Sequence, residues 1–258
     1  MSTPASPAPG VVVRHLDSLA EYERCCELEK LVWAGEDADL VPVTIFVVTK
    51  ETSGQVLGAF VGGQMIGFTL AMAAFHAAAD GGQQTYLHSH MTAVLSEYRD
   101  RGVGRMLKLF QRQDAIFRGI ALVEWTFDPL EMRNAHFNLM RLGAVVRKYH
   151  PNFYGITTSP LHGGMPTDRL VAEWWLKSDR VRRILTGETP RPSPMVKSVR
   201  VPRGIDALKK DNPASAETVQ FVVREQFEKW LTKDYAVVGF ELDDASGTYY
   251  LEPYEPPK

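Results

Sequence analysis

The stretch from Tyr98 to Leu107 constrains this chain most, because it puts two glycines where a predicted strand meets a predicted helix. The strand is expected over Thr85–Val94 and the helix over Val103–Phe117. Glycine weakens the start of a helix, so its presence indicates a demand on the backbone. We infer that Gly102 and Gly104 let a loop of N–H groups curve around an anion at the positive end of the helix dipole.

Several kinds of phosphate-binding loop use glycines in this way. A dinucleotide-binding fingerprint needs a third glycine where this chain has Met106, and a P-loop needs a Gly-Lys-Ser/Thr sequence that this stretch lacks. What remains is an Arg-x-x-Gly-x-Gly pattern formed by Arg99, Gly102 and Gly104. A chance Gly-x-Gly turn is the alternative at this point.

Composition and charge narrow the classes of partner. The 258 residues allow one large domain or two small ones, and 45% apolar residues can form a substantial core. The formal net charge of −2 gives no electrostatic reason to expect nucleic acid or an anionic membrane as partner. No apolar run is long enough to span a membrane. Residues 1–10 lack the basic and apolar regions of a signal peptide and are expected to be a flexible tail.

The chain has two cysteines, Cys25 and Cys26, which are neighbours in a helix expected over Leu16–Trp33. Neighbours on a helix point about 100° apart, so no disulfide is expected between them. No Cys/His ligand spacing lies nearby. We therefore expect packing cysteines, no metal site and a reducing, cytoplasmic compartment.

The hydrophobic pattern predicts an α/β protein with a sheet of mixed direction covered by helices. Strands are expected over 55–61, 64–75, 85–94, 120–127, 144–149, 169–176 and 195–201, and further helices over 134–142 and 215–231. A closing hairpin is expected from 235–241 and 248–252. The segment 41–52 fits either a strand or a short helix, because it is β-branched and has Pro42 near its start.

The helix over 103–117 is predicted to have two distinct faces. An apolar stripe should be buried, made of Val103, Met106, Leu107, Phe110 and Phe117. A basic face should be solvated, made of Arg105, Lys108 and Arg112.

A second motif follows. Asn134 begins a predicted helix, and Leu142-Gly143-Ala144 ends it. Together with the earlier Arg-x-x-Gly-x-Gly loop, this motif resembles the Gcn5-related N-acetyltransferase (GNAT) superfamily over about residues 11–157. The resemblance implies a GNAT-like mixed central sheet flanked by helices. We expect an acyltransferase domain over 11–177. The residues after the resemblance match nothing general in the family, but the predicted strand–helix–hairpin extension over 178–258 has enough apolar residues to pack on that domain.

The sequence Trp125-Thr-Phe-Asp-Pro-Leu130, followed by Asn134-Ala-His-Phe-Asn138, resembles a bacterial and archaeal subgroup of predicted acetyltransferases. Some relatives accompany N-acylamino acid racemases and are thought to succinylate amino acids. The resemblance implies an acyl-CoA-dependent enzyme that moves an acetyl or succinyl group to the amine of a small molecule such as an amino acid. A protein or peptide N-acetyltransferase and a non-catalytic acyl-CoA-binding module stay open. A homodimer is a further expectation.

The resemblance also implies where acetyl-CoA or another acyl-CoA binds as co-substrate. The pantetheine arm would pair with backbone near Val94, whose N–H groups would polarise the thioester carbonyl. The pyrophosphate would rest on the amides of Arg99, Asp100, Arg101, Gly102, Val103, Gly104 and Arg105. Asn134 and Asn138 complete the predicted binding set.

Candidate bases lie on two predicted strands. His88 and His90 are two residues apart and therefore share a face. By resemblance, His88 falls where some family members carry a catalytic Glu, and an imidazole with a pKa of about 6.5 can accept an ammonium proton. A structural pair of half-buried histidines is the alternative. Glu124 is the second candidate, with a solvent-facing carboxylate as its alternative, and Asp128 before a proline is expected to be a turn or cap residue.

The candidate acid departs from the family pattern. Many members carry a Tyr four residues before the helix-ending Gly, and this chain has Leu139 there. Tyr154 and Tyr149 are candidate substitutes, with packed aromatic residues as the alternative, and a thiolate can also leave without an acid. On the acceptor side, the resemblance implies Trp33, Glu36, Tyr154 and the region of Arg169.

Overall fold

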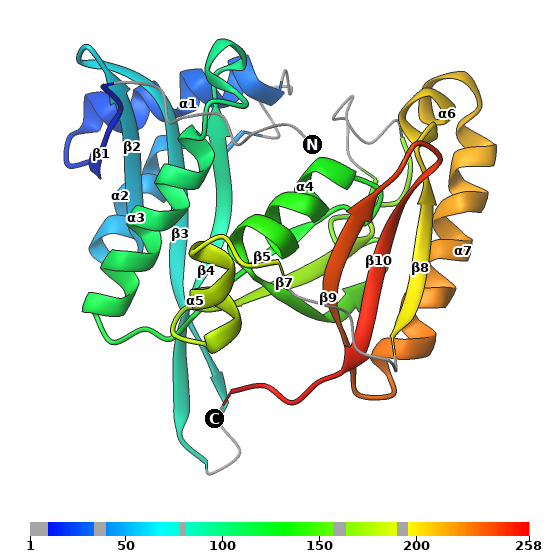
Figure 1. Cartoon of the computed structure of the whole chain (residues 1–258). Helices are drawn as coiled ribbons and strands as arrows, with labels where there is room; N and C mark the ends of the chain where they lie inside the picture. Colours follow the sequence, from blue (N-terminus) through cyan, green and yellow to red (C-terminus); the bar gives the residue numbers. More distant parts are fainter. Residues whose placement is uncertain (1–9, 34–39, 78–80, 157–163, 190–195, 258) are drawn as a thin grey trace. The chain divides into compact units, whose positions relative to one another are not determined.

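The computed structural model describes residues 10–33, 40–77, 81–156, 164–189 and 196–257 (Figure 1). Nearly all of the predicted tail over 1–10, and Glu36, lie outside these residues. The chain divides into two compact units, Met1–Val123 and Glu124–Lys258, which we call unit 1 and unit 2 and describe one at a time. No helix in the described ranges is long and apolar enough to cross a membrane.

Unit 1 contains an antiparallel sheet in the order β1-β2-β3-β4. Its strands are β1 Val12–His15, β2 Gln55–Val61, β3 Gln64–Ala77 and β4 Gln83–Val94. Its helices are α1 Leu19–Trp33, α2 Val43–Glu51 and α3 Val103–Phe117, with the 3₁₀ turn η2 Ser96–Tyr98 between β4 and α3. All three helices pack on the sheet, and α3 crosses β2, β3 and β4 (Figure 1).

The local sequence explains two features of unit 1. The ambiguous segment 41–52 is helical, because Pro42 has a φ of −68° that suits a helix start, and Phe46 and Thr49 bury one face. Gly62 and Gly63 have positive φ values of 56° and 82°, as a two-residue hairpin turn between β2 and β3 requires.

The predicted faces of α3 are partly wrong. Val103 and Leu107 are buried as expected, but Phe117 is 90% exposed, and Lys108, predicted to be solvated, is only 5% exposed. The buried face also includes Gln111 and Ala115. These residues follow Lys108 at spacings of three and seven, so the helix is rotated slightly relative to the predicted stripe. Both cysteines are free thiols; Cys25 packs in the core as predicted, and Cys26 is half-buried.

Unit 2 contains a sheet in the order β5-β7-β6-β9-β10-β8. Its strands are β5 Leu122–Phe127, whose first two residues belong to unit 1, β6 Val145–His150, β7 Arg169–Trp175, β8 Lys197–Pro202, β9 Tyr235–Leu242 and β10 Ser246–Pro253. Its helices are α4 Met132–His136, the π-helical η3 Phe137–Leu142, α5 Asp179–Leu185, α6 Ile205–Asp211 and α7 Pro213–Leu231.

The C-terminal elements continue the sheet of unit 2. β9 pairs with β6 through Val237 and Val146, and the predicted closing hairpin is present as β9 and β10. Helix α7 packs against β6, β8 and β9. The residues predicted as an extension therefore share a hydrogen-bonded sheet with β6 and β7.

Candidate functional site

The loop that follows β4 presents backbone donors at the start of α3. Asp100 and Gly102 have left-handed φ values of 60° and 78°, which turn the chain sharply into the helix. The first helical hydrogen bond runs from the Met106 N–H to the Gly102 carbonyl at 3.0 Å. The N–H groups of the preceding first turn have no acceptor within the helix, so they can bind an anion.

Gly104 leaves space in front of that first turn. A Cβ built on Gly104 would meet only the Val94 side chain, at 4.0 Å. The helix is therefore not closed by packing at this point, and the open space adjoins the end of β4. These residues fit a phosphate group of the kind the loop motif predicts.

Arg99 shapes the loop. Its Nε donates to the Val94 carbonyl at 3.2 Å, and its Nη2 donates to the Val32 carbonyl near the end of α1 at 3.5 Å. Arg101 lies over the Tyr98 ring at 5.9 Å. The arginine of the motif thus ties the loop to β4 and α1.

His88 and His90 lie on β4, the strand that runs into this loop. Their ring centres are 6.2 Å apart; His88 is half-buried and His90 is exposed. Burial lowers the pKa of His88, and the charges of His90 and Lys108 lower it further. At neutral pH His88 is therefore a neutral imidazole that can accept a proton.

The second candidate base and the candidate acid belong to unit 2. Glu124 on β5 is only 6% exposed, so the alternative of a solvent-facing carboxylate is wrong. Tyr154 is 46% exposed, its hydroxyl lies 3.0 Å from the hydroxyl of Thr126 on β5, and the Arg169 guanidinium lies 5.3 Å from its ring centre. Glu124 and Thr126 point to the same side of the strand.

Tyr149 is held in a structural network. Its hydroxyl donates to the buried Asp168 carboxylate at 2.5 Å, and Arg224 donates two hydrogen bonds to the same carboxylate, both of 2.8 Å. Burial and the Asp168 charge raise the pKa of Tyr149, which makes it a weaker acid. Of the two tyrosines, Tyr154 is the more exposed.

The second motif forms α4 and η3. Asn134 is exposed on α4, whereas Asn138 is 4% exposed and its carbonyl accepts the Ala144 N–H at 3.0 Å. Gly143 ends the π-helical turn with a φ of 82°, and a Cβ there would lie 3.2 Å from the Val181 backbone. This close approach explains why the motif ends in glycine.

The predicted turn role of Asp128 is confirmed. One carboxylate oxygen accepts the Leu130 N–H at 2.8 Å, and the other lies 3.3 Å from the Lys209 ammonium. In the described ranges no group of three or more His, Cys, Asp and Glu side chains is arranged to bind a metal.

The comparisons rest on structure, since no family pattern and no curated protein matches the sequence. The ribosomal-protein-S18-alanine N-acetyltransferase from Escherichia coli matches with a TM-score of 0.50 and 14% identity, over 65% of this chain and 95% of that one. Aminoglycoside 6′-acetyltransferase type Ii matches with a TM-score of 0.51 and 15% identity, over 65% of this chain and 98% of that one. A protein from Desulfovibrio desulfuricans assigned to the GNAT family of acetyltransferases matches with a TM-score of 0.50 and 14% identity, over 64% of this chain and 99% of that one.

This chain has the fold of the GNAT acetyltransferases. The predicted GNAT-like fold class is confirmed.

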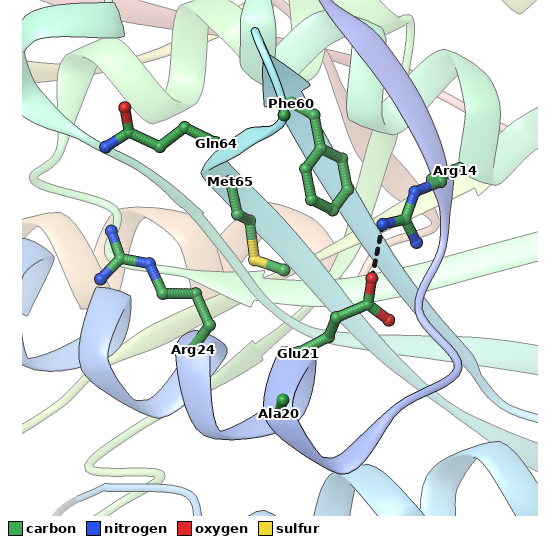
Figure 2. A pocket seen from close by; sticks show the side chains of 8 residues that line it. Arg14, Ala20, Glu21, Arg24, Phe60, Gln64 and Met65 are labelled. Atoms are coloured by element: carbon green, nitrogen blue, oxygen red, sulfur yellow. Dashed lines mark hydrogen bonds and ion pairs between the residues drawn. The ribbon is translucent and has the colours of Figure 1, made fainter.

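Within the GNAT fold, a separate pocket of about 560 Å³ lies in unit 1 (Figure 2). Arg14 pairs with Glu21 at 2.5 Å and lies over the Phe60 ring at 4.2 Å, and Arg24 and Met65 complete much of the lining. These residues come from the start of α1 and from β1 to β3. Arg99 of the candidate loop contacts Val32 near the C-terminal end of α1, whereas the pocket lies at the N-terminal end of this helix. The pocket is therefore not part of the candidate site.

The sequence interpretation missed Lys108. Its ammonium donates to the Ser89 hydroxyl at 2.7 Å and to the Gln111 side-chain oxygen at 3.1 Å. Ser89 lies on β4 between the two histidines. The spacing of Lys108 with Gln111 and Ala115 could have indicated this buried face, but the nearby Arg105 and Arg112 favoured a solvated one.

Proposed function

We propose that this chain is an acyl-CoA-dependent N-acyltransferase that moves an acetyl or succinyl group to the amine of a small molecule. The observation that carries the proposal is the first turn of α3, where Gly102 is left-handed and Gly104 leaves open space beside the end of β4. The GNAT fold supports it, because the similar structures include N-acetyltransferases.

The residues of the chain supply the following steps in this proposal. The amides from Arg99 to Arg105 and the exposed Asn134 bind the acyl-CoA, with backbone near Val94 polarising the thioester carbonyl. Neutral His88, or Glu124, accepts the proton of the acceptor ammonium. The freed amine nitrogen attacks the carbonyl carbon, the new C–N bond forms and the C–S bond breaks. The nitrogen then releases its second proton to solvent, which leaves the neutral amide. The leaving thiolate takes a proton from Tyr154 or from water.

The acceptor class is part of the proposal. One similar enzyme is named for an aminoglycoside and another for an alanine of ribosomal protein S18, so the fold supports amine acylation of either kind. The motif over 125–138 favours the small amine, and a protein or peptide acceptor is the second candidate.

The decisive experiment measures thiol release from acetyl-CoA and from succinyl-CoA. Each thioester is tested with D- and L-amino acids, with other small amines and with peptides that have a free N-terminal amine. Release that requires one thioester and one set of small amines is the expected result and names both substrates. Release with peptides alone would replace the small-molecule acceptor. No release with any amine, despite measurable CoA binding, would overturn the enzymatic proposal.

Gly104→Val should weaken CoA binding at least about tenfold, or about 1.4 kcal/mol, because the new side chain fills the space beside the first turn of α3. Calorimetric titration with CoA measures the affinity. Gly204→Val is the matched control, since Gly204 also faces open space but precedes α6 in unit 2. Unchanged affinity in a folded Gly104→Val variant would remove the loop from the proposal.

A further inference from the structure

A buried lysine joins α3 to β4. Lys108 is 5% exposed, and its ammonium donates to the Ser89 hydroxyl and to the Gln111 side-chain oxygen. The Gln111 amide also donates to the Ser89 hydroxyl, at 3.4 Å. Burying an ammonium group carries a large desolvation cost, so a hydrophobic side chain of similar length would pack here more cheaply. Stability alone therefore does not explain why Lys108 is buried against Ser89 and Gln111.

Ser89 lies at an irregularity of β4. In the pairing with β3, Ser89 is opposite Ala71 and Met91 is opposite Leu70, so His90 is an extra residue without a partner in the register. Such a bulge bends the strand and changes the direction of the side chains beside it. The hydrogen bond from Lys108 thus ends on the residue between His88 and His90.

Helix α3 contributes its first turn to the loop site and also carries Lys108. Lys108 follows Gly104 by one helical turn, or about 6 Å along the axis. A helix is stiff over this length, so the position of the first turn and the position of the Lys108 ammonium are linked.

We propose that Lys108 is a positioning residue, which through Ser89 fixes the β4 bulge and thereby the directions of His88 and His90. The role in catalysis rests on the proposed function, in which His88 accepts the acceptor proton. The structural part of the proposal does not depend on that function.

The electrostatics agree with this geometry. The charged groups that act on His88 within the described residues are His90 on the same strand and Lys108 on α3, and both disfavour its protonated form. Burial lowers the pKa of Lys108 itself to about 7. Removing the ammonium should therefore raise the pKa of His88 toward its ordinary value.

The test uses four variants of the full chain: Lys108→Met, Ser89→Ala, the double variant, and Gln113→Met as control. Gln113 is an exposed residue on the same helix. The pH titration of the His88 and His90 ring carbons by NMR needs no substrate. We expect Lys108→Met to raise the pKa of His88 and to shift the His90 resonance, Ser89→Ala to shift the His90 resonance, and Gln113→Met to do neither. Unchanged resonances in a folded Lys108→Met variant would overturn the proposal.

Kinetics test the positioning role with the amine and thioester that support thiol release. Lys108→Met should lower kcat by about ten- to a hundredfold, with the KM for acyl-CoA within about twofold, because a shift of about 1 Å in a catalytic group has an effect of this size. The low-pH limb of kcat/KM should move to higher pH with the pKa of His88.

Two kinetic results would contradict the proposal. One is a raised KM with an unchanged kcat. The other is full additivity of Lys108→Met and Ser89→Ala, which would show that Lys108 does not act through Ser89. If the wild-type chain acylates no amine, the proposed function fails alone, and the NMR titration still decides the structural role of Lys108.

Discussion

Units 1 and 2 treat their buried charges differently. In unit 1, Glu29 and Lys108 are 3% and 5% exposed, and the hydrogen bonds described for them involve neutral groups. The Glu29 carboxylate accepts the Val41 N–H at 3.1 Å, and the Lys108 ammonium donates to Ser89 and Gln111. Burial raises the pKa of Glu29 to about 7 and lowers that of Lys108 to about 7.

In unit 2, buried charges meet opposite charges. Asp168 is fully buried and receives two hydrogen bonds from Arg224, and Glu173 is fully buried and receives one from Arg147 at 2.9 Å. Each pair joins different elements: Arg224 lies on α7, and Arg147 lies on β6. The comparison indicates that unit 2 uses buried charge to tie its elements together, whereas unit 1 keeps groups that change charge near neutral pH, one of them beside β4.

The largest effect is expected where a pair of unit 2 is broken. Arg224→Leu leaves the Asp168 carboxylate buried without its cation and should lower the free energy of unfolding by about 3–5 kcal/mol, measured by urea denaturation. The matched control is Arg203→Leu, which removes an exposed ion pair of 3.7 Å with Asp244 and should change stability by less than about 1 kcal/mol. Equal losses in the two variants would mean that the buried pair is no stronger an anchor than a surface one.

The next effect concerns Lys108. Its pKa is about 7 when folded and about 10.5 when unfolded, so the unfolded chain binds more protons between these values. Deprotonation of Lys108 should therefore raise the free energy of unfolding of the wild-type protein as the pH rises over this range, by roughly 4 kcal/mol at most. Lys108→Met should lack that rise, as chemical denaturation at pH 6.5 and pH 9.5 can measure. A parallel pH dependence in both proteins would contradict the lowered pKa of Lys108.

The smallest effect concerns Glu29, and it has the opposite sign. A carboxyl group whose pKa rises from 4.5 to about 7 on folding binds more protons in the folded state, so wild-type stability falls as pH rises through this range. Glu29→Gln removes this loss and should be more stable than wild type by about 2–3 kcal/mol at pH 8, with no such gain at pH 4.5. The same stability difference at both pH values would contradict the raised pKa.

The sequence predicted the positions of the helices and strands better than the contacts between them. Helix α3 has the predicted bounds, and the hairpin of β9 and β10 was expected, because long periodic patterns and turn residues are local signals. The four-residue β1 and the seven-residue helices α5 and α6 were missed, since so few residues show little periodicity.

The candidate site was predictable only in part. The glycine loop after β4 follows from residue types and spacing. The burial of Lys108 against Ser89 does not, because it depends on how α3 is rotated on the sheet. Likewise, nothing local in the sequence indicates that Arg224 meets Asp168 across 56 positions of the chain.

The pairing of Val237 with Val146 has a consequence for shortened chains. A protein that ends before β9 would leave the outer edge of β6 open at Val146, which is fully buried in the whole chain. Open apolar strand edges recruit other strands and lead to aggregation. The last residues of this chain therefore protect its solubility, and we expect truncation before Tyr235 to give insoluble protein.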